Sequence, residues 1–265
     1  MHQKRGSASG SWQIEGFLSY DGDVPTEAKP HARPVRPLRR ALGALVLTTL
    51  IVSLASYLLP ADYESVGVAV GFLGMAYLLV LRGDDTVLIR HHGLSLGGLL
   101  ESEPIDPRRL ARDLGRALRW GLGMGLLCFP PFWLGYLWWW KPAGPFLAAP
   151  LGTLGEELVG QLVVIALPEE AFYRGYLQTA LDDVWRPRWR LLGAPVGWGI
   201  VVTSAVFALG HLVTEPHPNR LAVFFPALLF GWLRNRTGGI GAAVTFHALC
   251  NLFSSYLERS YGLGS

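Results

Sequence analysis

The chain has 265 residues and a net charge of +3, from 23 Lys and Arg against 20 Asp and Glu. Hydrophobic residues make up 51% of it and charged residues only 16%, against about 25% charged residues in an ordinary soluble domain. This composition argues against a soluble enzyme, a disordered protein and a nucleic-acid-binding protein, since the basic residues lie between apolar blocks and form no continuous face. The two cysteines, Cys128 and Cys250, lie in apolar segments and provide neither a disulfide framework nor a Cys-based zinc site.

The remaining class is a polytopic membrane protein, with an all-α transmembrane helical bundle of about seven spans (six to eight) as its predicted fold. A helix needs about 20 apolar residues to cross the apolar core of a bilayer. Residues 1–40 are rich in Gly, Ser and Pro and are predicted to form a flexible cytoplasmic tail, so the membrane-embedded domain covers residues 41–265. The predicted spans are 41–59, 66–81, 120–140, 154–181, 191–213, 221–233 and 239–257.

The distribution of Lys and Arg predicts the orientation of these spans. With the N-terminus in the cytoplasm, the cytoplasmic side holds seven of these residues in the tail, seven in 82–119, three in 182–190 and two in 234–238. The opposite side holds only Lys141, Arg220 and Arg259. The abundance of Arg, Ala, Gly and Leu is typical of a high-GC bacterium, which predicts an integral protein of a bacterial inner (plasma) membrane.

The connection 82–119 contains a predicted amphipathic helix. Asp106 is a favourable N-cap and Pro107 a favourable first residue. Leucines 110, 114 and 118 share one face, with arginines on the others. This pattern is typical of a helix that lies on an anionic membrane surface, which makes membrane lipids an expected partner. A solvated connecting helix is the alternative.

Three predicted spans carry polar residues at helical spacing, and ionisable groups inside a bilayer normally mark a function. In the span 154–181, Glu170 and Arg174 are four residues apart and so share a helical face as an ion pair. Glu169 lies about 100° further round the helix and is predicted to stay free. Pro168, just before them, is predicted to kink the helix.

The two other polar motifs are Phe207-x-x-x-His211 and His247-x-x-x-Asn251. Each places its pair on one face of a helix, so all three motifs are expected to meet in one buried polar chamber. A lone His or Asn in such a helix is more often a packing residue, and Glu170–Arg174 alone could be a structural bridge. Two adjacent carboxylates in an apolar span have no such simple structural explanation.

In this order, the three motifs resemble the signature motifs of the CPBP family (CAAX proteases and bacteriocin-processing enzymes, also called Abi). The run from Phe230 to Gly238 also resembles the family's lead-in to the third motif. The resemblance covers residues of about 155–257, which is the predicted catalytic core, and leaves the N-terminal spans unmatched.

The resemblance implies an intramembrane endopeptidase that hydrolyses a peptide bond near the membrane-proximal or C-terminal end of a membrane-associated protein or peptide. Glu169 would be the general base that activates water, and His211 would hold and polarise that water. His247 and Asn251 would form the oxyanion hole. The supporting residues would be Glu170, Arg174 and Phe207.

The sequence is compatible with two mechanisms, one that uses a zinc ion and one that does not. His211, His247 and Glu169 are a legitimate zinc-ligand set. The chain has no HExxH motif, however, and Asn is a poor zinc ligand, so we favour a glutamate mechanism without a metal or other cofactor.

Two other functions compete with proteolysis. One is a catalytically inactive membrane scaffold or immunity-type protein, which should have lost at least one of the four catalytic positions. The other is a proton or ion transporter, for which the chain lacks internal repeats. The expected partners are lipids and a membrane-associated substrate rather than nucleic acid, and the sequence predicts no oligomeric state.

Overall fold

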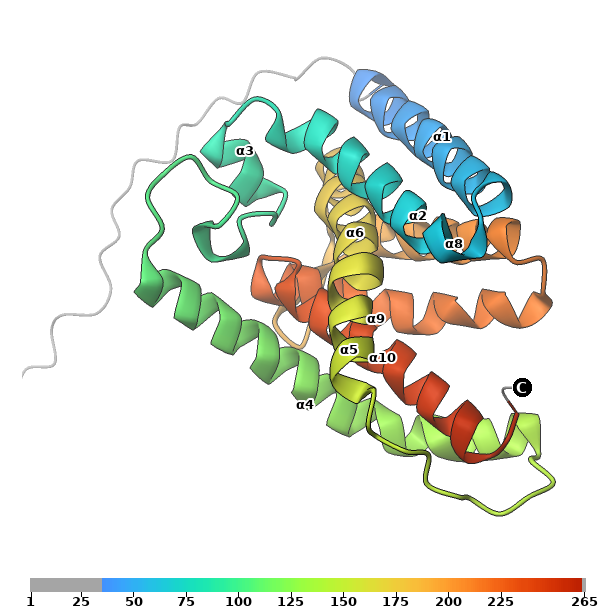
Figure 1. The fold of residues 1–265 in the computed structure, drawn as a ribbon. Helices are drawn as coiled ribbons and strands as arrows, with labels where there is room; N and C mark the ends of the chain where they lie inside the picture. Colours follow the sequence, from blue (N-terminus) through green and yellow to red (C-terminus); the bar gives the residue numbers. More distant parts are fainter. Residues whose placement is uncertain (1–34, 264–265) are drawn as a thin grey trace, which may run out of the picture. The chain divides into compact units, whose positions relative to one another are not determined.

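The computed structural model describes residues 35–263, which are mostly helical (Figure 1). The α-helices are α1 (Val35–Leu58), α2 (Ala61–Ala76), α3 (Thr86–His91), α4 (Pro107–Trp140), α5 (Leu154–Gly160), α6 (Leu167–Glu170), α7 (Thr179–Val184), α8 (Trp198–Thr214), α9 (Phe224–Thr237) and α10 (Gly241–Ser260). Three π-helical segments, η1 (Tyr77–Leu81), η3 (Gln161–Ala166) and η4 (Ala171–Gln178), and two 3₁₀ segments, η2 (Leu96–Gly98) and η5 (Pro218–Val223), adjoin them. The strands are β1 (Trp189–Leu191) and β2 (Ala194–Val196).

Two helices of the described part are long and apolar enough to cross a membrane, Pro37–Leu58 and Ala61–Leu81, and α8 is a shorter apolar helix. The predicted bundle of seven spans is therefore not confirmed. The other predicted spans fall on helices that do not pass the same test of length and apolar composition. The amphipathic helix and the span predicted after it form one helix, α4, whose first half carries the arginines.

The N-terminal helix begins earlier than predicted. It starts at Val35, so the end of the predicted tail is helical, while residues 1–34 of that tail lie outside the described residues. Pro37 lies in its first turn, where a missing backbone N–H costs nothing. α1 packs against α2, joined to it through the short Leu59–Pro60 connection (Figure 1).

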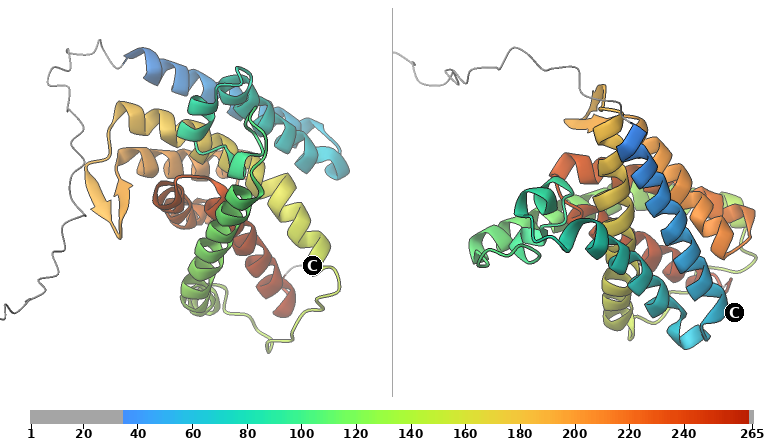
Figure 2. Two further views of the ribbon diagram at one scale, coloured as in Figure 1. Left: turned by 90° about the vertical axis from the view of Figure 1, so that its left-hand side faces the viewer. Right: turned by 90° about the horizontal axis from the view of Figure 1, so that it is seen from above.

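The span predicted over 191–213 is wrong at its start, and the fold is not purely α-helical. Residues Trp189–Val196 form an antiparallel hairpin with Arg190 opposite Pro195, and α8 begins only at Trp198 (Figure 2). Leu192 and Gly193 at its turn have φ of 48° and 82°. A two-residue hairpin turn needs this left-handed conformation, which Gly adopts readily. Pro195 also lacks a backbone N–H for a helix.

The span predicted over 221–233 is shifted towards the C-terminus. Its first residues belong to η5, and α9 runs on to Thr237, beyond the arginine expected to end it. Arg234 is 7% exposed and donates from Nη2 to the carbonyl oxygen of His91 (2.7 Å). The protein itself thus satisfies this charge, and the helix need not end at it.

The segment that carries the paired glutamates is one helical run from Leu154 to Val184, seen in Figure 1 through α5 and α6. It becomes π-helical on either side of α6, where Pro168 lies near the first turn. A π-helical turn changes the hydrogen-bond register and so accommodates a residue that has no N–H. The run therefore passes Pro168 without ending, and it packs against α2, α8, α9 and α10.

The long helices α4 and α10 lie side by side (Figures 1 and 2). Gly121 permits their close approach, because a Cβ atom there would lie 2.6 Å from Cβ of Thr245. Further along, the rings of Phe129 and Phe253 stack with centroids 4.4 Å apart. α10 thereby carries the third motif against both α4 and α9.

The connection 82–119 is fixed by an ionic cluster. The side chain of Glu101 is only 1% exposed and accepts hydrogen bonds from Arg109 (2.6 Å) and Arg90 (2.7 Å). These two guanidinium groups hold the pKa of Glu101 well below its usual range. The predicted cap of α4 is confirmed, since Asp106 accepts from the backbone N–H of Arg108 (2.9 Å).

Candidate active site

The first motif lies on α6 and η4. Glu170 and Arg174 are both fully buried, with Nη1 of Arg174 lying 3.3 Å from Oε1 of Glu170. The ion pair predicted from their spacing is thus present. Nη2 of Arg174 also donates to the carbonyl oxygen of Ala227 on α9 (3.1 Å).

Aromatic rings surround the guanidinium group of Arg174. Its Cζ atom lies 4.5 Å from the ring centroid of Phe207, 5.2 Å from that of Phe230 and 5.8 Å from that of Tyr173. The negative faces of such rings attract a cation. The buried positive charge is therefore stabilised by one carboxylate, one carbonyl group and three rings.

Glu170 also joins the first motif to the third. Nδ1 of His247 donates to Oε1 of Glu170 (2.9 Å), across 77 residues of sequence. The imidazole of His247 stacks on Phe230, with centroids 4.7 Å apart and planes 15° apart. Because Nδ1 carries the proton that the carboxylate accepts, Nε2 is the nitrogen left for chemistry. Nε2 lies 3.8 Å from Oε2 of Glu169.

Glu169 is placed very differently from its neighbour. Its side chain is 12% exposed, and its Oε2 atom is buried without a hydrogen-bond partner among the described residues. It lies on the wall of a cavity of about 460 Å³, which His211 and Tyr173 also line. Oε2 of Glu170 also lacks a partner among the described residues, but of the two carboxylates only Glu169 lines the cavity. A buried carboxylate oxygen without a donor is costly to keep, so its retention on a cavity wall points to chemistry.

The second motif orients its histidine through the backbone. Nδ1 of His211 donates to the carbonyl oxygen of Phe207 (3.0 Å), and the two rings lie 4.5 Å apart. Neutral His211 therefore presents Nε2 as a hydrogen-bond acceptor. Phe207 also lies 5.9 Å from His247, so this ring contacts the members of all three motifs.

Asn251 has a partner that the sequence interpretation missed. Its Nδ2 donates to Oε1 of Gln161 on η3 (2.8 Å), and Asn251 is not among the residues that line the cavity. The structure thus brings Glu169, Glu170, Arg174 and His247 together directly, whereas Asn251 lies one helical turn further along α10. Gln161 was detectable as the first polar side chain inside the apolar part of the span 154–181.

The N-terminal helices contribute to the same cavity, which the motif comparison did not anticipate. α1 and α2 supply polar side chains to its wall, and Ser56 donates to Glu64 (2.5 Å). The signal in the sequence was a set of hydroxyl residues at helical spacing in an otherwise apolar helix. The polar residues from α1 and α2 are Thr49, Ser53, Ser56, Glu64 and Ser65.

The residues proposed as zinc ligands do not form a ligand set. Within residues 35–263, no three His, Cys, Asp or Glu side chains lie close enough together to hold one metal ion. His211, His247 and Glu169 as placed therefore do not fit a zinc ion.

Residues 139–253 match the family model for type II CAAX prenyl endopeptidase Rce1-like proteins. The match covers less than half of the chain but includes all three motifs, and it confirms the predicted resemblance to the CPBP/CAAX protease family. No curated protein and no solved structure matches the chain.

Proposed function

We propose that this chain, which matches a membrane-embedded CAAX-type protease family over residues 139–253, is an intramembrane endopeptidase in which Glu169 activates the attacking water. The observation that carries the proposal is the buried, unpartnered Oε2 atom of Glu169 on the cavity that His211 also lines. A carboxylate without a donor is free to accept a proton from water.

Water would be held between two hydrogen-bond acceptors. Glu169 offers a carboxylate oxygen, and His211 offers Nε2 because its Nδ1 proton is donated to Phe207. A water molecule that donates both protons in this way directs its lone pairs towards a peptide carbonyl carbon. Glu169 takes one proton during the attack and later passes it to the leaving amine.

His247 is the proposed donor to the oxyanion. Its Nδ1 proton is donated to Glu170, and in the imidazolium form Nε2–H would donate to the oxyanion. Arg174 lies 3.3 Å from the same Glu170 oxygen and completes this buried cluster. Asn251 has a second amide N–H besides the one donated to Gln161, and we assign it to the same oxyanion.

The proposed substrate is an extended, membrane-associated protein segment or peptide. A cavity of about 460 Å³ accommodates a few residues rather than a folded domain. The hydroxyl groups from α1 and α2 on its wall can bond to the backbone of an extended chain. Because bacteria generally lack prenylated CAAX proteins, we expect a peptide or sorting-signal substrate rather than a prenylated protein.

Substitution of Glu169 also tests two other functions, a membrane scaffold and a proton or ion transporter. A scaffold would not need an unpartnered buried carboxylate. A proton or ion transporter would use Glu169 as a carrier site, and substitution there would alter transport rather than proteolysis.

The deciding experiment compares Glu169→Gln with the matched control Glu156→Gln, which alters an exposed carboxylate on the same helical run. Each is expressed in a strain that lacks the chromosomal copy, and new protein termini are counted in the membrane proteome. We expect Glu169→Gln to lower cleavage by a factor of about 10² or more. Its insertion and thermal stability should match those of wild type, and Glu156→Gln should cleave normally.

A fully active Glu169→Gln protein would contradict the proposed role of Glu169. Zinc content and chelation provide a second arm. We expect cleavage to persist after long incubation with a strong chelator. If the purified protein carried one zinc ion per chain, and His247→Ala lost both the zinc and the activity, the mechanism would be metal-dependent rather than glutamate-based.

A further inference from the structure

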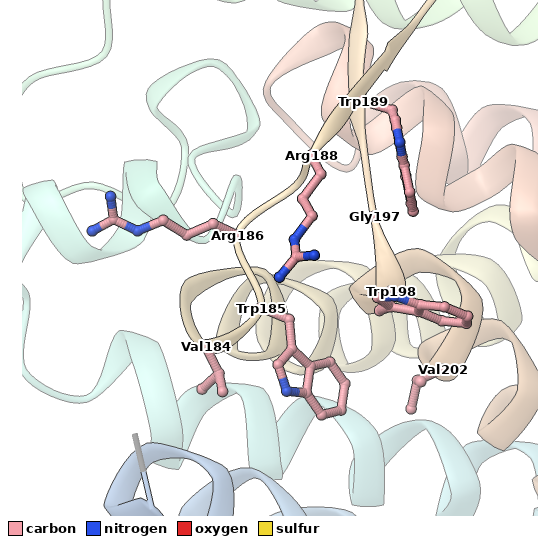
Figure 3. Close-up of a pocket in the computed structure, with 8 residues that line it drawn as sticks. All are labelled: Val184, Trp185, Arg186, Arg188, Trp189, Gly197, Trp198 and Val202. Carbon is pink, nitrogen blue, oxygen red and sulfur yellow. The ribbon is translucent and has the colours of Figure 1, made fainter. Parts of the chain in front are cut away.

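A second cavity, of about 530 Å³, lies between the end of α7 and the start of α8 (Figure 3). It shares no lining residue with the candidate active site. Its wall combines indole and guanidinium groups with small apolar residues. The lining residues are Val184, Trp185, Arg186, Arg188, Trp189, Gly197, Trp198 and Val202.

The charged residues that line this cavity are the arginines Arg186 and Arg188. None of its lining residues is acidic. The nearest carboxylates along the chain do not line the cavity. Asp182 accepts from Asn235 through Oδ2 (3.1 Å), while its Oδ1 atom has no partner among the described residues, and Asp183 bonds to His91 (3.0 Å). Within residues 37–263, Arg188 forms no ion pair. The cavity is therefore complementary to an anion.

Only one of the two arginine side chains in the wall points into the cavity. Figure 3 shows the guanidinium group of Arg188 directed towards the space between Trp185 and Trp198, whereas that of Arg186 points away from them. Trp198 is 57% exposed, and Trp185 is 36% exposed. The indole rings thus offer free apolar surface beside a free guanidinium group.

The hairpin next to this cavity has the composition of a membrane interface. Leu191 and Leu192 at its tip are 56% and 79% exposed, and Trp189 is 58% exposed. Exposed Trp and Leu beside arginines are typical of segments that lie at the headgroup level of a bilayer. Since the matched family is membrane-embedded, the anion available to this cavity is the phosphate group of a membrane phospholipid.

We propose that this cavity binds the phosphate headgroup of an anionic membrane phospholipid. The fork of the Arg188 guanidinium group matches a phosphate with two parallel hydrogen bonds. Trp185 and Trp198 pack against the glycerol and the first carbons of the acyl chains. This site is separate from the proposed active site and does not depend on the proposed function.

The test uses the full-length protein in a neutral detergent, so that no charged bilayer surface contributes. Phosphatidylglycerol and phosphatidylcholine are titrated separately, and retained lipid is counted by native mass spectrometry. We expect one phosphatidylglycerol per chain and much weaker retention of phosphatidylcholine. Arg188→Gln should weaken phosphatidylglycerol binding about tenfold or more, the loss expected for a charge-assisted hydrogen bond.

The matched control is Arg190→Gln, which removes the same charge from the neighbouring strand β1 outside the cavity and should leave binding unchanged. Equal losses in both variants, or equal binding of the two lipids, would overturn the proposal. If inorganic phosphate or glycerol phosphate displaces phosphatidylglycerol at equal concentration, the ligand would be a soluble phosphate compound rather than a lipid. Phosphatidylglycerol should also raise the melting temperature of wild type but not of Arg188→Gln, and equal rises would contradict the site.

Discussion

Glu169 and Glu170 are neighbours in sequence but have opposite environments. Each has an Oε2 atom without a hydrogen-bond partner among the described residues, but Glu170 is fully buried between His247 and Arg174, whereas Glu169 lines a cavity. One carboxylate therefore organises the site and the other is available to react. Burying an ionised group is tolerated only where opposite charge and hydrogen bonds compensate it, which describes Glu170.

The first prediction concerns the support of Glu170. Arg174→Ala removes a buried cation and leaves Glu170 without its opposite charge, which should cost about 3–5 kcal/mol of folding free energy. We expect less folded protein and a lower melting temperature in detergent. Asn251→Ala, which leaves the Glu170 cluster intact, should give a normal yield and slower turnover. Normal folding of Arg174→Ala would show that the ion pair does not support the site.

At the scale of elements, the geometry of the candidate site depends on how closely α10 packs against α4. α10 carries His247 and packs against α4 and α9, and it approaches α4 closely at Gly121. A backbone-to-backbone approach of this kind requires a residue without a side chain, as is common between helices in membranes. The spacing of α4 and α10 therefore helps to set the position of His247 relative to Glu169.

A pair of glycines on α4 tests this packing. A Cβ atom at Gly121 would meet Thr245 at 2.6 Å, whereas one at Gly123 would meet nothing within 4 Å. We expect Gly121→Ala to destabilise the protein by about 1–3 kcal/mol through overpacking. Gly123→Ala should be neutral or stabilising by up to about 1 kcal/mol, because Ala favours the helix. Thermal unfolding in detergent measures both, and equal effects would contradict the close contact.

At the scale of the whole molecule, orientation in the membrane decides which side supplies substrate and lipid. Pro37–Leu58 and Ala61–Leu81 are the candidate spans, and the short connection between them must lie on the side opposite the N-terminus if both cross. The arginines beside the second cavity lie in 182–190, which the charge distribution assigns to the cytoplasm.

Reporter fusions test this orientation directly. Fusions after residue 62 and within 144–150 should report the outside, and fusions at residues 100 and 187 should report the cytoplasm. The reason is that cytoplasmic loops of membrane proteins retain an excess of Lys and Arg. A cytoplasmic signal at residue 62 would overturn the whole arrangement.

Local patterns in the sequence were sufficient for several features. Apolar composition predicted a helical membrane protein, four-residue spacing predicted the Glu170–Arg174 pair, and Asp106 predicted the start of α4. These features depend on residues within one or two helical turns, so periodicity and capping preferences carry the information. The hairpin at 189–196 was missed because its apolar residues run on into α8, although Gly193 and Pro195 within it are turn signals.

Other features required the folded chain. His247 as the partner of Glu170, Gln161 as the partner of Asn251, and the wall that α1 and α2 add to the cavity all join residues far apart in sequence. Spacing along a chain carries no information about such contacts, because helix packing and the π-helical turns beside Pro168 decide which faces meet. Composition and motifs thus determined the class of the protein and its candidate reactive side chains. Only tertiary packing placed Glu169 on a cavity wall, with its Oε2 atom unpartnered among the described residues.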